Sequence, residues 1–311
     1  MTEKLSDIVI GQGIAAHAFL WTYAQMIKEG RLDRARRVIW IKSPVFPTCS
    51  LTSTSLISRA GLHRGESRHG DHLIAGFELF QKYFQNFSGV EVATQKHLPH
   101  GDIDNFNKRF GDAPEACLLA SSRVFLSSLE QTFKSILKDS LIELSDTLVE
   151  YSEHEITLHS GKKLNFNQCY LALGAANSLL GFTDKTRAVS GQYAHAKADL
   201  GESAWILSKG PHNLIYRAQD KTLLLGSLDD KEDELGWPNL APRTNDLKSI
   251  LENFEVDLPK GLDWKIEVGV RHKGHKRLPF WGRVAGEVYS IHGLYKNGYT
   301  LAFLAAKELL R

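Results

Sequence analysis

The 311-residue chain lacks the features that identify a disulfide-stapled, metal-bound or membrane-spanning protein. Its three cysteines, Cys49, Cys117 and Cys169, are scattered with no C-x-x-C pair, so the sequence predicts neither a disulfide framework nor a structural metal site. No apolar run approaches the roughly 18 residues that span a bilayer. Strand-forming residues begin too close to Met1 to leave room for a signal peptide. We therefore expect a cytoplasmic protein with no metal and no membrane partner.

The sequence also lacks an excess of charge of either sign. Its 38 basic and 36 acidic residues give a net charge of +2, which disfavours nucleic acid as a partner. The one basic stretch that hints at such binding is GLHRGESRH, residues 61–69. With 42% hydrophobic and 24% charged residues, the chain has the composition of a globular protein. Its length allows one large domain or two interleaved ones, and its oligomeric state, a homo-oligomer included, stays open.

What is present is a glycine pattern near the N-terminus. The stretch DIVIGQGIAAHAF places Gly11, Gly13 and Ala16 in the spacing G-x-G-x-x-A after an apolar run that predicts a strand. IAAHAFLWTYAQMIKEG then predicts a helix that Gly30 ends, and RVIWI predicts a second strand. In this context the glycines permit a tight turn and let the backbone approach a diphosphate at the helix N-terminus. The predicted nucleotide-binding turn consists of Gly11, Gly13, Ile14, Ala15 and Ala16.

The end of the second predicted strand departs from the usual pattern. Lys42, followed by Ser43, stands where Asp or Glu normally accepts hydrogen bonds from ribose hydroxyls, and an ammonium group can only donate. Three interpretations stay open. Lys42 donates to a ribose oxygen or a phosphate, it selects a 2′-phosphate as in NADP, or it points to solvent. The polar stretch KEGRLDRARR before it predicts a helix extension or a longer surface turn.

The rest of the chain predicts helices at both sides of a strand-rich middle. HLIAGFELFQKYFQNF predicts an amphipathic helix with Phe77, Phe80 and Phe84 in the core, and RVFLSSLEQTFKSILKD predicts another. A hairpin is expected around Ser160-Gly161, and QCYLALGA predicts a buried strand that ends at Gly174, where a backbone can approach a ligand. The pattern is β-rich after residue 189, and YTLAFLAAKELL predicts a final helix.

The order of these motifs resembles the FAD-dependent amine and amino-acid oxidoreductases of the D-amino-acid oxidase and glycine oxidase type over nearly the whole chain. VIGQGIAA resembles the FAD diphosphate turn of that family, and YLALGAANSLL resembles its second nucleotide strand. VSGQ and TLLLGSLDD are similar to strands of its substrate domain. GVRHKGHKRLPFWG resembles its Gly-x-Arg-Pro…Pro-x-Ile-Gly block, and GLYKNGYTLAFLAAKELL is similar to its Gly-His-x-Arg-Asn-Gly helix start.

The resemblance implies an α/β fold with two interleaved domains. A Rossmann-like FAD-binding domain of the glutathione-reductase type would comprise residues 1–75, 120–190 and 275–311. A mixed-sheet α+β substrate domain would comprise residues 76–119 and 191–274. The implied activity is oxidation of a small primary or secondary amine that bears a carboxylate, by hydride transfer to the flavin.

The resemblance also assigns roles to single residues. It implies that Arg271 binds the substrate carboxylate as a planar fork, with Tyr216 as a pocket residue or, alternatively, a core tyrosine. The implied turn facing the flavin pyrimidine oxygen with its backbone amides consists of Lys296, Asn297, Gly298 and Tyr299. Lys296 replaces the usual arginine, which keeps the positive charge and loses the bidentate geometry.

Two other function classes stay open at this point. Lys42, and His272 in place of the family's proline, favour a catalytically degenerate FAD-fold protein that acts as a binding or regulatory module. The resemblance extends to the flavin domain of a bifunctional enzyme that trims carboxymethylaminomethyl-uridine in tRNA, and the near-neutral charge disfavours that interpretation. His195, His272, His275 and His292 share no metal-ligand spacing, and we expect structural roles for them.

Overall fold

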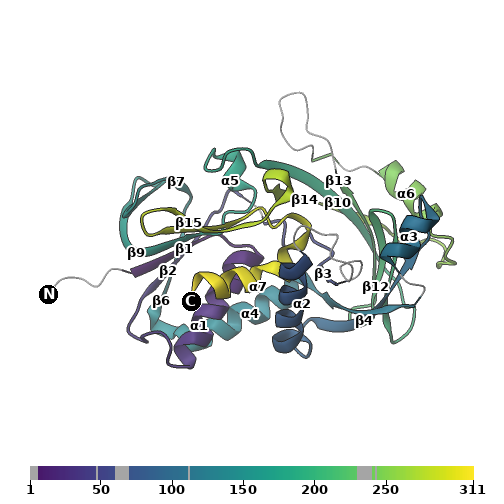
Figure 1. The fold of residues 1–311 in the computed structure, drawn as a ribbon, viewed down its shortest axis with the longest axis horizontal. Coiled ribbons are helices and arrows are strands. Elements are labelled where there is room, and N and C mark those ends of the chain that lie inside the picture. The colour runs from purple at the N-terminus through teal and green to yellow at the C-terminus, as the bar shows by residue number, and fades with distance from the viewer. Residues whose placement is uncertain (1–5, 47, 60–69, 111–112, 230–239, 242–243) are drawn as a thin grey trace. The chain divides into compact units, whose positions relative to one another are not determined.

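The computed structural model describes residues 6–46, 48–59, 70–110, 113–229, 240–241 and 244–311 (Figure 1). The chain divides into two compact units. The first comprises Met1–Thr48, Leu126–Ala188 and Arg271–Arg311, and the second comprises Cys49–Phe125 and Val189–Val270. The second unit includes the described residues 49–59 and 70–75, which the division expected from the sequence assigns to the FAD-binding domain.

The first unit is built on a largely parallel sheet with the strand order β15-β16-β9-β1-β2-β6, to which the β7–β8 hairpin is attached through β9. Strand β1 pairs in parallel with both β2 and β9, and β15 pairs antiparallel with β16. The strands are β1 (Ser6–Ile10), β2 (Val38–Lys42), β6 (Leu141–Ser145), β7 (Leu148–Tyr151), β8 (Glu155–Leu158), β9 (Lys163–Leu171), β15 (Phe280–Ala285) and β16 (Val288–His292).

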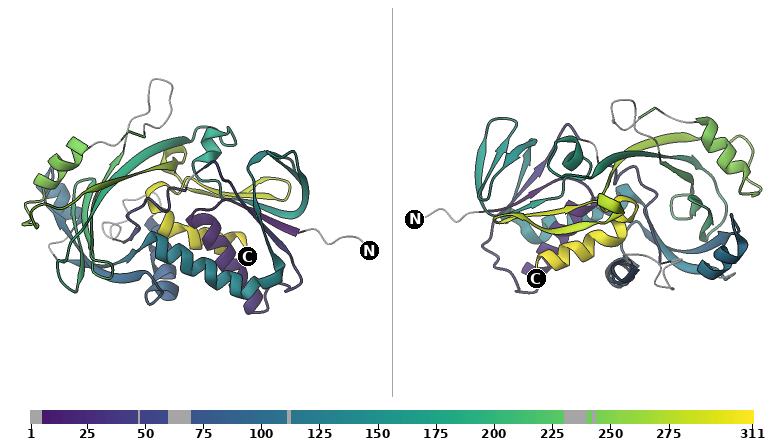
Figure 2. Two further views of the ribbon diagram at one scale, coloured as in Figure 1. Left: turned by 180° about the vertical axis from the view of Figure 1, so that it is seen from behind. Right: turned by 45° about the horizontal axis from the view of Figure 1, so that its top comes forward.

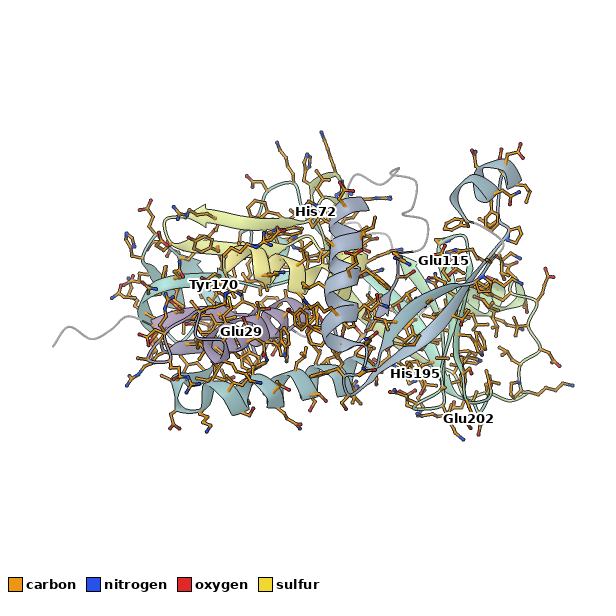
Figure 3. All side chains as sticks on the ribbon, turned by 60° about the horizontal axis from the view of Figure 1, so that its bottom comes forward. Glu29, His72, Glu115, Tyr170, His195 and Glu202 are labelled. Atoms are coloured by element: carbon orange, nitrogen blue, oxygen red, sulfur yellow. The ribbon has the colours of Figure 1, made fainter. Side chains whose placement is uncertain are left out.

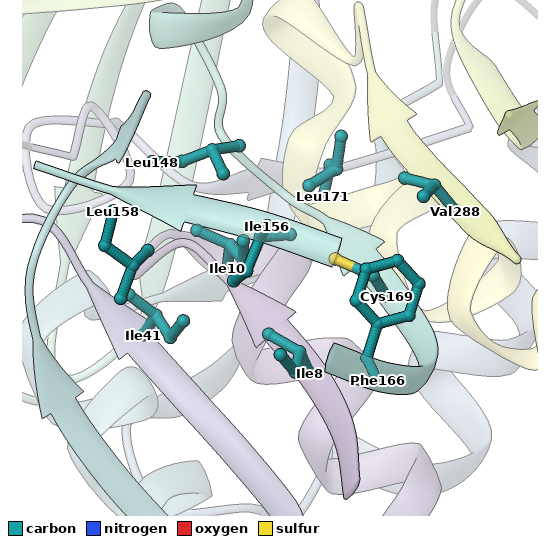
Figure 4. Close-up of a cluster of buried hydrophobic side chains, with 10 residues drawn as sticks. All are labelled: Ile8, Ile10, Ile41, Leu148, Ile156, Leu158, Phe166, Cys169, Leu171 and Val288. Atoms are coloured by element: carbon teal, nitrogen blue, oxygen red, sulfur yellow. The ribbon is translucent and has the colours of Figure 1, made fainter. Parts of the chain in front are cut away.

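Helices cover one face of this sheet, and the β7–β8 hairpin packs on the other. Helices α1 (Ile14–Lys28), α4 (Ser122–Leu137) and α7 (Gly298–Leu309) lie together on one side (Figures 1 and 2). Trp40 packs against His17 of α1, and the ring centroid of Tyr170 lies 4.0 Å from that of Phe19 in the same helix. Tyr170 is labelled in Figure 3. Alternate strand residues form an apolar cluster under the hairpin (Figure 4), which includes Ile8, Ile10, Ile41, Leu148, Leu158 and Leu171.

The second unit is built on a mixed sheet with the order β14-β10-β13-β12-β11-β4-β5-β3. Its strands are β3 (Leu56–Ile57), β4 (Val90–Leu98), β5 (Glu115–Ala120), β10 (Arg187–Lys197), β11 (Ala204–Lys209), β12 (His212–Arg217), β13 (Thr222–Asp229) and β14 (Lys265–Lys273). Its helices are α2 (Gly70–Phe84), α3 (Ile103–Arg109) and α6 (Thr244–Glu252). Strand β14 ends in the first unit, so it carries Arg271 there.

The strongest local patterns of the sequence form the predicted elements. The strand, glycine turn, helix and strand of the N-terminus are present as β1, α1 and β2, and the predicted C-terminal helix is α7. Phe77, Phe80 and Phe84 are buried as predicted. Helix α1 ends at Lys28, so the predicted helix extension through KEGRLDRARR is wrong and a longer turn is right. Among the described residues, no helix combines the length and apolarity needed to cross a bilayer.

Backbone hydrogen bonds join the carboxyl end of β1 to the ends of its two neighbours, β9 and β2. The backbone N–H of Ala172 donates to the Ile10 carbonyl at 2.8 Å, and that of Gly11 donates to the Ile41 carbonyl at 2.9 Å. Gly11 has a φ of +135°, and a Cβ atom there would overlap the carbonyl oxygen of Ala172. Only glycine therefore fits this turn.

We expect Gly11→Ala to lower the free energy of unfolding by about 2–5 kcal/mol, because the methyl group collides with a backbone carbonyl at a strained φ. Gly161→Ala is the matched control: its φ is +82° and nothing lies within 4 Å of the added Cβ, so backbone strain alone costs about 1–2 kcal/mol. Urea unfolding measures both variants. Equal losses would contradict the tight approach at Gly11.

Candidate nucleotide-binding and active site

The topology of the first sheet defines where a ligand binds. The chain leaves β1 through α1 to reach β2 on one side, whereas β9 pairs with β1 on the other side. In open α/β sheets, ligands bind outside the carboxyl ends of the strands where connections diverge in this way. The glycine turn follows β1 at this edge, and Gly174 follows β9 with a φ of +57° and open space around it. The fold thus brings the predicted Gly11 and Gly174 to one edge.

Two helix N-termini meet at this edge. Gly13 is the N-cap of α1, with no side-chain cap and no acidic residue in the first turn. A Cβ atom on Gly298, the first residue of α7, would lie 3.3 Å from Ile14 Cγ2, so α7 begins against the first turn of α1. The first backbone N–H groups of a helix have no acceptor within the helix, and they carry its positive dipole end. This arrangement suits an anionic ligand.

Three cationic side chains surround one aromatic ring just before α7. The Arg271 guanidinium lies 5.2 Å from the ring centroid of Tyr295, and the Lys273 and Lys296 ammonium groups each lie 5.7 Å from it. Arg271 and Lys273 are alternate residues of β14 and therefore share a face. The structure thus brings together the predicted Arg271 and Lys296. Cations held over an aromatic face add a local positive potential to the helix N-terminus.

A buried histidine fixes the end of β14 against this turn. The His272 Nδ1 atom accepts a hydrogen bond from the Gly293 N–H at 3.2 Å, and Lys273 forms an antiparallel bridge with Leu294. His272 is 4% exposed, and burial, with His292 nearby, lowers its pKa to about 3. Burial likewise lowers the pKa of His292 to about 4. Both imidazoles are therefore neutral at neutral pH. His272 positions the Gly293 backbone, and His292 Nδ1 shares a hydrogen bond of 2.9 Å with the Ser290 hydroxyl.

Lys42 belongs to a closed ring of ion pairs. Its ammonium lies 2.5 Å from Glu143 Oε2 and 3.8 Å from Glu130 Oε1, and Lys134 lies 2.6 Å from each of these two glutamates. The His17 imidazole, with Lys134 and Lys42, holds the pKa of Glu130 at about 2. Because β2 pairs in parallel with β6, Lys42 is next to the strand that carries Glu143.

The ring answers the question that the sequence leaves open at Lys42. Of the three interpretations, none included an intramolecular partner, yet the Lys42 ammonium pairs with Glu143 and lies 4.1 Å from the Trp40 ring centroid. It does not point to solvent without a partner. Ser43, the next residue, forms a side-chain hydrogen bond with Thr147 at 2.8 Å, so it links the ends of β2 and β6.

Tyr216 and two of the histidines have contacts of other kinds. Tyr216, in the second unit, is fully buried, and its hydroxyl donates to the Gly201 carbonyl at 2.9 Å and accepts from the Leu200 N–H. These contacts are those of the core alternative given for Tyr216, and its role as a pocket residue stays a prediction. His195 faces Glu267 at 3.7 Å within the second unit, and His275 is exposed.

Sequence reasoning missed three residues around the glycine turn. The Trp40 Nε1–H donates to the Gly11 carbonyl at 2.6 Å. The Gln12 amide contacts the segment after β2. Asn177 is 1% exposed and donates to the Gly174 carbonyl, while its Oδ1 atom has no partner among the described residues. Trp40 stands in an apolar run that is typical of any buried strand, and the spacing of the glycines allows any residue type at position 12. Neither residue therefore gives a local signal of such contacts.

Two further expectations from the sequence concern metal ions and nucleic acid. In the part of the chain that the structure describes, no group of three His, Cys, Asp or Glu side chains is placed to hold a metal ion. The basic stretch at residues 61–69, the one hint of nucleic-acid binding, lies outside the described residues.

The ion-pair ring predicts the outcome of reversing the charge at Lys42. Lys42→Glu places a third carboxylate beside Glu143 and Glu130, and we expect the free energy of unfolding to fall by about 1–2 kcal/mol. Adding Glu143→Lys restores an opposite pair and should recover part of this loss. Urea unfolding of both single variants and the double variant gives the coupling energy. Lys163→Glu, at an isolated exposed pair with Glu155, is the control and should change the free energy of unfolding little. A coupling energy of zero between Lys42 and Glu143 would contradict the ring.

The buried histidines predict a fall in stability on the acidic side. Between about pH 6.5 and pH 4 the unfolded chain binds protons that folded His272 and His292 do not, so stability falls as the pH falls, by up to about 1.4 kcal/mol per unit for each. His272→Asn keeps an acceptor for Gly293 and should flatten this slope. Urea unfolding from pH 7 to pH 4 measures it, with the exposed His154→Asn as control. An unchanged slope in His272→Asn would contradict the assignment.

Comparisons with known proteins bear on the fold. No model of a known protein family matches the sequence, and no curated protein matches it. Solved structures do match. Iminodiacetate oxidase from Chelativorans sp. BNC1 has a TM-score of 0.75 at 15% identity, covering 98% of this chain and 94% of that one. Glycine oxidase from Geobacillus kaustophilus has a TM-score of 0.74 at 12% identity, covering 99% and 94%.

A third structure adds a bound cofactor. Dithionite-reduced L-α-glycerophosphate oxidase from Mycoplasma pneumoniae, with FAD bound, has a TM-score of 0.73 at 11% identity, covering 100% of this chain and 94% of that one. Identities of this size establish architecture and leave the substrate undetermined. The chain therefore has the α/β fold of the glycine oxidase and D-amino-acid oxidase type over its whole length, as its sequence motifs predict.

Proposed function

We propose that the chain is an FAD-dependent oxidoreductase that oxidises a small primary or secondary amine bearing a carboxylate. The observation that carries this proposal is the gathering of Arg271 and Lys296 around Tyr295, directly before the N-terminus of α7. Cationic side chains for a substrate acid thus lie next to a helix N-terminus, and that helix packs on the glycine turn. The fold shared with a glycine oxidase and an iminodiacetate oxidase supports the same chemistry.

The edge of the first sheet fits the diphosphate of FAD. The Gly11 turn brings backbone close to the edge, and the first turn of α1 carries no acid that would repel phosphate. Asn177 offers a buried acceptor oxygen with no partner among the described residues, which suits a ligand hydroxyl. The residues that would hold the diphosphate are Gly11, Gly13, Ile14, Ala15, Ala16 and Gly174, and those that would face the flavin are Asn297, Gly298 and Tyr299.

Arg271 is proposed to bind and orient the substrate carboxylate. A planar guanidinium forms two parallel hydrogen bonds with a carboxylate, which fixes both the position and the rotation of the amino acid. The Tyr295 ring beside the guanidinium and the bridge between Lys273 and Leu294 hold Arg271 in place. Orientation of this kind lowers the entropic part of the barrier. Lys296 adds positive charge without the fork.

The chain's own groups support loss of a hydride from the amine carbon. Bound FAD supplies the hydride acceptor, and the nitrogen lone pair then forms the C=N bond of an imine. Backbone N–H groups at the start of α7, with the positive end of the helix dipole, stabilise the negative charge that accumulates in this step. His272 and His292 have lowered pKa values, so both are neutral and add no charge of their own to this stabilisation. The step needs no histidine base when the amine binds in its neutral form.

The proposal predicts a yellow protein whose colour is bleached anaerobically by a carboxylate-bearing amine. Arg271→Ala should reduce the rate of bleaching at low substrate concentration by roughly 30- to 1000-fold, the loss of a charge-assisted bidentate pair of about 2–4 kcal/mol. Arg271→Lys should recover little, because an ammonium cannot form the fork. Flavin content should stay near normal in both.

The measurement is stopped-flow absorbance with a panel of simple and N-substituted amino acids. Arg283→Ala, at an exposed arginine of β15, is the control and should behave as the wild type. If no such amine bleaches the wild type, the catalytic proposal fails and the binding or regulatory interpretation replaces it. If Arg271→Ala bleaches as fast as the wild type, the role of Arg271 is wrong.

A further inference from the structure

The ribose of a dinucleotide needs an acceptor near the end of β2, and the residue at that position does not provide one. A ribose hydroxyl is held there by the oxygen of an acidic side chain. Lys42 has no acceptor atom, and its ammonium is engaged by Glu143 and Glu130. An acceptor for the ribose would then come from a residue other than Lys42.

Gln12 lies in that turn, and the orientation of its amide is determined by its partners. Its Nε2 atom donates to the Ser43 carbonyl at 3.0 Å and to the Phe46 carbonyl at 2.7 Å. Carbonyl oxygens only accept, so the nitrogen and not the oxygen must face them. Both amide hydrogens are used in these bonds. Because Oε1 is attached to the same planar group, it is held as an acceptor with a fixed direction.

The backbone that carries Gln12 is held on both sides. Gly11 is fixed by its close approach to Ala172, and its carbonyl accepts the Trp40 Nε1–H at 2.6 Å. Gly13 begins helix α1. The half-buried Gln12 therefore bridges the diphosphate turn and the segment that follows β2. A ribose that connects a diphosphate on α1 to a base lies between these same two segments.

We propose that Gln12 Oε1 accepts the hydrogen bond from a ribose hydroxyl of the adenosine half of the dinucleotide, in place of the missing carboxylate. This inference rests on the proposed function, because it needs a dinucleotide at this edge. The acceptor is neutral, so it contributes less than a carboxylate. Its fixed orientation offsets part of that difference, because little side-chain freedom is lost on binding.

The test compares ligands that differ in the ribose hydroxyls alone. The protein, freed of flavin, is titrated calorimetrically with ADP and with 2′,3′-dideoxy-ADP. We expect wild type to bind ADP about 5- to 10-fold more tightly, the effect of one neutral hydrogen bond. In Gln12→Leu this ratio should fall to about 1. In Lys42→Met the ratio should stay at the wild-type value, because Lys42 is engaged by Glu143.

Other outcomes overturn the inference. If Gln12→Leu weakens both ligands equally and keeps the ratio, Gln12 only supports the loop. If Glu143→Gln removes the ratio while Gln12→Leu keeps it, the ion-pair ring supplies the acceptor. Gln12→Met serves as a second variant where urea unfolding shows that Gln12→Leu does not fold. A wild-type chain that binds neither ADP nor FAD overturns the proposed function itself, which is a different result from a ratio that does not depend on Gln12.

Discussion

The contact of the Gly11 backbone with the Ala172 carbonyl is the constraint on which the candidate site depends. It closes the carboxyl ends of β1 and β9 on each other with no room for a Cβ atom. Helix α1 begins two residues after this contact, with Gly13 as its N-cap, and α7 packs on its first turn through Gly298 and Ile14. The two helix N-termini are adjacent because the strands below them are.

Trp40 links this turn to the charged side chains at the end of β2. Its indole N–H binds the Gly11 carbonyl, and its ring packs edge-on against His17 of α1 and Phe133 of α4. The ammonium of Lys42 lies over the same ring. One fully buried side chain thus connects the glycine turn, two helices and the ion-pair ring, so the position of the phosphate-binding backbone depends on packing well below the edge of the sheet.

The sequence was sufficient for the features that depend on local pattern. Gly11, Gly13 and Ala16 predict the turn because the spacing of small residues between a strand and a helix is itself the structural requirement. The motif order predicts the fold, and the solved structures confirm it. The partners of Lys42 were out of reach, because Glu130 and Glu143 come from α4 and β6, about a hundred residues further along the chain. Gln12 and Tyr216 show the same limit, since a hydrogen-bond partner depends on how strands align and not on the residue type.

The ion-pair ring has a consequence for the ionic environment of any phosphate ligand. Its two ammonium groups and two carboxylates cancel in charge, and the anion contacts proposed at the diphosphate turn come from backbone N–H groups. Backbone dipoles carry no condensed counterions, and a neutral ring adds little long-range field. The ring and the diphosphate turn would then add little ionic-strength dependence to nucleotide affinity, and such dependence would come instead from Arg271, Lys273 and Lys296 beside the start of α7.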